Sequence, residues 1–153
     1  MIKKNYLALF AKSFNWAGFF LPKNVYHDCS KLYAFCRVLD DLVDEKTNLE
    51  LRMERFDEIT NIFKKTYELN NNDRRVLNQN EHEIIVKDMI VLAENNNIKR
   101  IILDDLIDGV GSDLKQKVYL RSVKDLLVYS YRVAGAVGLI MAKILNVNDI
   151  RSL

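Results

Sequence analysis

Residues 32–45 read LYAFCRVLDDLVDE, and this stretch decides the fold class. Successive residues of an α-helix are rotated by about 100°, so residues three or four apart share a face. One face of the expected helix is polar and carries Tyr33, Arg37, Asp40 and Asp44. The opposite face is apolar and carries Leu32, Phe35, Leu39, Leu42 and Val43. The spacing therefore predicts a long amphipathic helix that buries one side in a hydrophobic core.

The carboxylates on the polar face leave two interpretations open. Like charges four residues apart destabilise a helix by about 0.2–0.5 kcal/mol per pair, so something should offset the repulsion between Asp40 and Asp44. One interpretation is a solvated face on which Arg37 pairs with Asp41, four residues later. The other is a site for Mg²⁺, which prefers oxygen ligands and is usually held by one or two carboxylates together with substrate phosphates. Arg37 would then reach a phosphate oxygen.

The composition is typical of a globular, mostly helical protein. The 153 residues are 49% hydrophobic and 29% charged, and a single proline with five glycines favours helices over turn-rich β structure. The length fits one domain, 1–153. The net charge is +2 and no basic run interleaved with aromatic residues is present, so no nucleic acid is expected as a partner.

The cysteines and the first residues bear on location. Cys29 and Cys36 would lie about 10 Å apart on one helix, beyond the reach of a disulfide. Two reduced thiols fit a cytoplasmic protein. Residues 1–20 are basic at the start and rich in apolar side chains, but polar residues interrupt them and no cleavage-site pattern follows, so we expect no signal peptide.

Other helices are predicted on both sides of the acidic stretch. Residues 6–20 form an expected aromatic-rich helix whose aromatic side chains are mostly core. Pro22 suits the first position of the helix that ends near Asp44. A capping box at 47–50 predicts a second helix from about Asn48 to Leu69.

Two further helices are predicted in the second half of the chain. An amphipathic helix is expected to end at the asparagines 95–97. A second capping box at 122–125 opens a helix to about Leu145. Its apolar run is long enough to suggest a membrane span, but Arg132 near its centre costs about 2.5–3.5 kcal/mol on insertion scales, which argues against one.

Three stretches together resemble blocks of the squalene/phytoene synthase family, in matching order. They are SFNWAGFFLP (13–22), LYAFCRVLDDLVDE (32–45) and YSYRVAGAVGLIMAKIL (129–145). The resemblance covers nearly the whole chain and is weak between about residues 54 and 98. It implies an all-α, isoprenoid-synthase-type helical bundle, of which this chain would be the N-terminal half and therefore incomplete. That family joins two prenyl diphosphates head to head with the help of Mg²⁺.

The resemblance also implies roles for individual residues. The metal ligands for Mg²⁺, or for Mn²⁺ in its place, would be Asp40, Asp41 and Asp44. The catalytic residues would be Tyr33, Arg37 and Tyr129, the last through proton transfer or cation stabilisation by its phenol. The residues in contact with the prenyl diphosphate would be Ser13, Phe14, Arg37, Val133 and Gly138.

Residues 103–109 read LDDLIDG, a near copy of residues 39–45. Asp104, Asp105 and Asp108 therefore suggest a second acidic motif, but no Tyr or Arg precedes them at the phase seen in the first one. The string LIDGVGSDL instead resembles a different family block, a helix broken at glycines that lines the prenyl pocket. We therefore do not assign these three aspartates to metal.

The small residues of the last helix predict a close approach. Ala134, Gly135, Ala136 and Gly138 form a surface almost free of side chains. Glycine within a helix costs about 1 kcal/mol relative to alanine, so the patch should serve a purpose. Either a neighbouring helix or a prenyl chain would lie along it.

The resemblance implies a prenyltransferase that condenses two prenyl diphosphates. Phytoene from geranylgeranyl diphosphate is favoured over squalene from farnesyl diphosphate, because the string at 131–145 is closer to bacterial carotenoid enzymes. The family's second acidic pair is not found in this chain, so a missing C-terminal half or a partner subunit is expected. The alternative is a non-catalytic relative that acts as a scaffold or assembly factor. The expected location is cytoplasmic, with peripheral association with a membrane left open.

Overall fold

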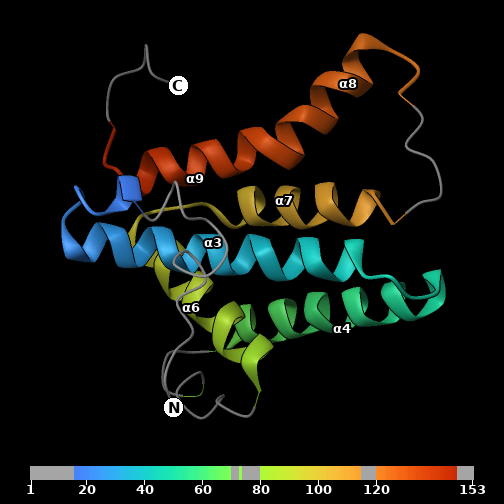
Figure 1. Ribbon diagram of the computed structural model, residues 1–153, viewed down its shortest axis with the longest axis horizontal. Coiled ribbons are helices and arrows are strands. Elements are labelled where there is room, and N and C mark those ends of the chain that lie inside the picture. The colour runs from blue at the N-terminus through green and yellow to red at the C-terminus, as the bar shows by residue number, and fades with distance from the viewer. Residues whose placement is uncertain (1–15, 70–72, 74–79, 115–119, 148–153) are drawn as a thin grey trace.

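The computed structural model describes residues 16–69, 73, 80–114 and 120–147. Within these residues every regular element is a helix, which confirms the all-α prediction (Figure 1). The residues predicted at the diphosphate end, Ser13 and Phe14, lie outside the described residues, and so does most of the helix expected over 6–20.

The acidic stretch lies on α3 (Lys23–Asp44), which runs through the middle of the bundle. The helices that follow in the described chain are α4 (Leu49–Glu68), α6 (Glu81–Asn95), α7 (Arg100–Ser112), α8 (Val123–Ser130), the π-helical turn η1 (Tyr131–Gly135) and α9 (Ala136–Ile144). Figure 1 shows α4 and α6 on one side of α3, and α7, α8 and α9 on the other. The last three described elements form one continuous long helix.

The apolar face of α3 is the centre of the core, as its spacing predicts. Leu32, Phe35 and Leu39 are each exposed by no more than 1%. Phe35 packs against Phe63 of α4 with the ring centroids 6.3 Å apart, and α6 supplies fully buried side chains such as Met89. Burial of one large apolar side chain stabilises a fold by about 1.5–3 kcal/mol, so this face holds the bundle together.

The helix starts follow the capping signals, with one shift. The side chain of Asn48 accepts a hydrogen bond from the backbone N–H of Leu51 (2.8 Å), so Asn48 caps α4 rather than Thr47, the first residue of the predicted box. Ser122 caps α8 by accepting from the backbone N–H of Asp125 (3.1 Å), as predicted. A side-chain acceptor at this position satisfies a backbone donor that has no partner within the helix.

Two expectations about the ends of the bundle are wrong. The described aromatic residues before α3 are not core, since Trp16, Phe19 and Phe20 are exposed by 74%, 88% and 78%. They lie in the turn that leads into α3, and the rings of Trp16 and Phe20 contact each other edge to face instead. The helix at the second acidic motif is also not broken at its glycines, because α7 continues through Gly109 and Gly111.

The last helix forms over the predicted range but contains a π-helical turn at 131–135. A π turn rotates the side chains after it relative to those before it, and such turns are frequent at functional sites. The two ends of this helix differ accordingly: α9 buries Ala136, Ile140 and Ile144, whereas α8 buries no side chain. By length and composition alone, the described helix Val123–Ile144 is apolar enough to cross a membrane.

Candidate functional site

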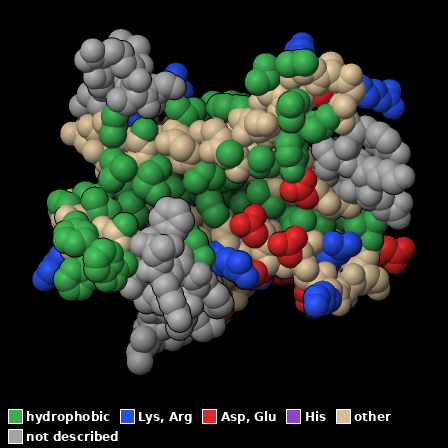
Figure 2. Space-filling view, turned by 45° about the horizontal axis from the view of Figure 1, so that its top comes forward, with side chains coloured by type: hydrophobic (Ala, Val, Ile, Leu, Met, Phe, Trp, Pro, Cys, Tyr) green, Lys and Arg blue, Asp and Glu red, His purple; other side chains and the backbone are tan. Residues whose placement is uncertain are grey.

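The polar stripe of α3 lies at the surface of the described bundle. Tyr33 and Arg37 are half-buried, and Asp40 and Asp44 are exposed. Figure 2 shows acidic side chains gathered beside a broad hydrophobic surface. The stripe is therefore accessible to a ligand whose one end is charged and whose other end is apolar.

Arg37 makes the ion pair that the spacing predicts. Its Nη2 lies 2.6 Å from Oδ1 of Asp41 and its Nε donates to Oδ2 of the same carboxylate (3.1 Å). Both side chains are 39–50% exposed, so water screens the pair and its contribution to stability is small. An exposed arginine of this kind can exchange its carboxylate for a phosphate at little cost.

Asp40 is surrounded by other acids. Partial desolvation raises the pKa of its carboxyl, and the charges of Asp44, Asp41 and Asp113 raise it further, while Arg37 lowers it. Asp44 lies one turn along α3, whereas Asp113 is the C-terminal cap of α7. Carboxylates from two helices therefore act on the same position, and a bound cation would relieve their repulsion.

Tyr129 reaches this group of acids from α8. Its phenol donates a hydrogen bond to Oδ1 of Asp113 (2.9 Å). This hydrogen bond, together with desolvation and the charge of Asp113, raises the pKa of Tyr129. The phenol therefore stays protonated near neutral pH and keeps a proton to donate.

Asp113 is the residue that the sequence reasoning missed. It lies outside the LDDLIDG motif, and its link to Tyr129 spans a sequence separation of 16 residues. The only signal in the sequence is its spacing, since Asp113 follows Gly109 by one helical turn. That spacing becomes informative only once Gly109 is known to contact the last helix.

The predicted prenyl contacts on the last helix lie beside an open surface. Val133 is half-buried, and a Cβ built on the exposed Gly138 would meet no atom within 4 Å. The described residues therefore place no helix against Gly138. The close approach predicted for glycine occurs instead at Gly109, where a Cβ would lie 2.7 Å from Cβ of Arg132.

The aspartates of the second acidic motif have arginine partners. Asp104 lies 3.4 Å from Arg100, and Asp105 and Asp108 lie 3.6 Å and 3.9 Å from Arg132. Their charges are thus partly offset by side chains of α7 and η1.

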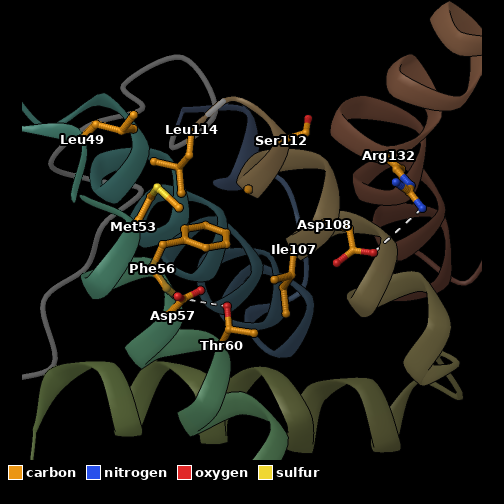
Figure 3. A pocket seen from close by; sticks show the side chains of 11 residues that line it. Leu49, Met53, Phe56, Asp57, Thr60, Ile107, Asp108, Ser112, Leu114 and Arg132 are labelled. Atoms are coloured by element: carbon orange, nitrogen blue, oxygen red, sulfur yellow. Dashed lines mark hydrogen bonds and ion pairs between the residues drawn. The ribbon is translucent and has the colours of Figure 1, made fainter. Parts of the chain in front are cut away.

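A pocket of about 520 Å³ opens between α4 and α7, away from the predicted site residues (Figure 3). Its lining residues are Leu49, Met53, Phe56, Asp57, Thr60, Ile107, Asp108, Gly111, Ser112, Leu114 and Arg132. Arg132 points toward Asp108 at one edge (Figure 3). None of the residues predicted to bind metal or diphosphate lines this pocket, so we do not assign it to that function.

The donor set on α3 suits a particular kind of metal binding. Among the residues that the structure describes, no three His, Cys, Asp or Glu side chains form a group able to hold an ion. Asp40 and Asp44 nevertheless offer carboxylate oxygens one helical turn apart, and Mg²⁺ is commonly held by one or two carboxylates while phosphates and water complete its sphere. The residues therefore fit an ion shared with a diphosphate rather than one enclosed by protein.

A family model described as squalene/phytoene synthase matches residues 7–152. The chain belongs to the squalene/phytoene synthase family. This confirms the family resemblance seen in the three sequence blocks.

Similar proteins include three bacterial enzymes. A phytoene synthase of Cereibacter sphaeroides is 32% identical over 140 residues, which are 90% of this chain and 38% of the relative. A 15-cis-phytoene synthase of Paracoccus sp. is 29% identical over 143 residues, 91% of this chain and 44% of the relative. A 15-cis-phytoene synthase of Pantoea ananas is 28% identical over 145 residues, 94% of this chain and 46% of the relative. The chain thus spans less than half the length of these relatives.

Proposed function

We propose that this chain supplies the site for one prenyl diphosphate in a Mg²⁺-dependent prenyltransferase of the phytoene synthase type. The observation that carries the proposal is the exposed acidic stripe of α3, together with the 2.9 Å hydrogen bond that joins Tyr129 of α8 to Asp113 at the end of α7, a helix that packs against α3. The membership of the family and the three similar phytoene synthases support the same chemistry.

The site residues divide into those that bind the charged end and those that act on the apolar end. Asp40 and Asp44, with Asp41 at the edge of the stripe, would hold Mg²⁺, or Mn²⁺ in its place. The ion would neutralise charge on the leaving diphosphate. Arg37 shifts from Asp41 to a phosphate oxygen, which adds a second positive charge at the point where negative charge develops.

The remaining predicted residues face the reacting carbon chain. Tyr33 lies one turn before Arg37 on α3, and Tyr129 holds a protonated phenol that donates to Asp113. Val133 and Gly138 border an open surface on which the prenyl chain would lie. The prenyl chain and further polypeptide would have to cover this surface, because a reactive carbocation must be kept from water. Ser13 and Phe14, which lie outside the described residues, remain a prediction for the diphosphate end.

The complete condensation needs more polypeptide than this chain contributes. Two prenyl diphosphates require two sets of charged ligands, and the chain corresponds to less than half of each similar phytoene synthase. We therefore propose that a C-terminal continuation or a partner subunit supplies the second set. Geranylgeranyl diphosphate, giving phytoene, is favoured over farnesyl diphosphate, giving squalene. A cytoplasmic location with peripheral membrane association suits such apolar products.

The proposal is tested by ligand-dependent stabilisation of the chain. A ligand that binds only the native state raises Tm, and the rise grows with the logarithm of its concentration relative to Kd. We expect geranylgeranyl diphosphate with Mg²⁺ to raise Tm, and EDTA to abolish the rise. Asp40→Asn should abolish it as well, while Asp104→Asn, the same position of the second acidic motif, should retain it. A Tm that does not change when Mg²⁺ is added with geranylgeranyl or farnesyl diphosphate would refute the proposal.

One observation favours the alternative of a non-catalytic scaffold. The apolar side chains of α8 are exposed in the described chain, including Val123 (74%) and Leu127 (64%). Exposed apolar surface often marks an interface. A scaffold predicts no response to Mg²⁺ or prenyl diphosphate, together with self-association that Leu127→Lys abolishes in analytical ultracentrifugation.

A further inference from the structure

Gly109 fixes how α7 lies against the last helix. A Cβ at this position would lie 2.7 Å from Cβ and 2.9 Å from the carbonyl carbon of Arg132, so only glycine permits the contact. The two helices run in opposite directions (Figure 1). The residue one turn after Gly109 therefore faces the residue one turn before Arg132. These two residues are Asp113 and Tyr129, and the 2.9 Å hydrogen bond joins them.

The end of α7 is also fixed on the side of α4. A Cβ at Gly111 would lie 2.7 Å from Cε1 of Phe56, a side chain that is only 6% exposed. The hydroxyl of Ser112 donates to the carbonyl of Gly109 (2.6 Å), which closes the last turn. Asp113 follows directly, with a helical backbone conformation. Its carboxylate is thus carried by a backbone that is held from two directions.

Asp113 differs in its partner from the other aspartates of α7. Asp104, Asp105 and Asp108 pair with arginines, whereas Asp113 accepts a hydrogen bond from a neutral phenol. Its charge also acts on Asp40 of α3. Asp113 therefore joins the end of α7, a helix that packs against α3, to Tyr129 of α8.

We propose that Asp113 is a positioning residue that fixes the Tyr129 phenol at the end of α7. This inference rests on the proposed function, because that function assigns Tyr129 to the reaction. A reacting group displaced by about 1 Å can cost on the order of 100-fold in rate. A rigid acceptor at the end of α7 prevents such a displacement, and it does so without touching the substrate.

The experiment places 3-fluorotyrosine at position 129 of the full chain and follows its ¹⁹F signal. The variants are Asp113→Asn and, as a matched control on the same helix, Asp104→Asn. The first measurement is a pH titration without ligand. Loss of the Asp113 charge should lower the pKa of the residue-129 phenol, whereas the control should leave it unchanged. The second measurement adds Mg²⁺ with farnesyl thiodiphosphate, an analogue that reacts slowly.

The second measurement separates positioning from a purely structural role. We expect the analogue to move the ¹⁹F signal in the parent chain and in the control. The second measurement uses Asp113→Ala, because the amide oxygen of asparagine could still accept the hydrogen bond from the phenol. In Asp113→Ala the analogue should still raise Tm, but the ¹⁹F signal should no longer move to the same position. An identical ligand response in Asp113→Ala and the parent overturns the inference and leaves the proposed function intact. No ligand response in the parent overturns both, while the titration still reports whether the hydrogen bond exists.

Discussion

The chain contains nearly the same heptapeptide twice, LDDLVDE at 39–45 and LDDLIDG at 103–109, and the two copies have different surroundings. Both bury their leucines. In the α7 copy all three acids lie near arginines, whereas in the α3 copy Asp41 pairs with Arg37 and the pKa of Asp40 is raised by desolvation and by neighbouring carboxylates. The neighbours of an acidic motif, and not its sequence alone, therefore make it a candidate metal site.

The seventh position of the two copies explains much of this difference. Glu45 is half-exposed at the end of α3 and pairs with Arg55. Gly109 is buried and lets the backbone of η1 approach α7, which brings Arg132 within reach of Asp105 and Asp108. A single glycine thus converts one copy into a helix-packing motif.

The largest expected effect is the loss of stability when a core leucine of either copy is truncated. This loss should be the same in both copies, because their apolar faces are equivalent. Leu39 and Leu103 are exposed by 1% and 0%. Replacement of either by alanine leaves a cavity and should lower the free energy of unfolding by about 2–5 kcal/mol. Urea denaturation followed by circular dichroism measures this loss. A loss below 1 kcal/mol in one copy alone would show that the two motifs do not share a core role.

The second-largest expected effect is a difference in stability between alanine substitutions at Gly109 and at Gly138. Gly109→Ala forces a methyl group against Arg132 and should destabilise the chain by about 1–3 kcal/mol. Gly138→Ala is the matched control, since its Cβ would meet open space and alanine favours a helix by up to about 1 kcal/mol. The same denaturation experiment should therefore give opposite signs. Equal signs would contradict the packing role of Gly109.

How far the sequence predicts this molecule depends on whether a property is local. Periodicity located α3 and its buried face, and the serine cap of α8, because these depend on residues a few positions apart. The exposed position of Trp16 and the unbroken passage of α7 through Gly109 depend on contacts with distant segments. The link between Asp113 and Tyr129 is of the same kind, so no local pattern could reveal it.

The smallest effect concerns the pH dependence of the two copies in metal-free buffer. The raised pKa of Asp40 means that its carboxyl binds a proton more readily in the native chain than in the unfolded chain. Above a pH of about 3.9, the ordinary pKa of an aspartate, the ionised carboxyl therefore lowers the free energy of unfolding. Asp40→Asn should thus be more stable than the parent at pH 7, by a fraction of a kcal/mol because the site is solvated, and should lose this gain at pH 3.5. Asp104→Asn instead loses its ion pair with Arg100 and should gain nothing at pH 7. Denaturation at the two pH values measures both, and a gain for Asp104→Asn equal to that for Asp40→Asn would show that the acids of α3 are no more crowded than those of α7.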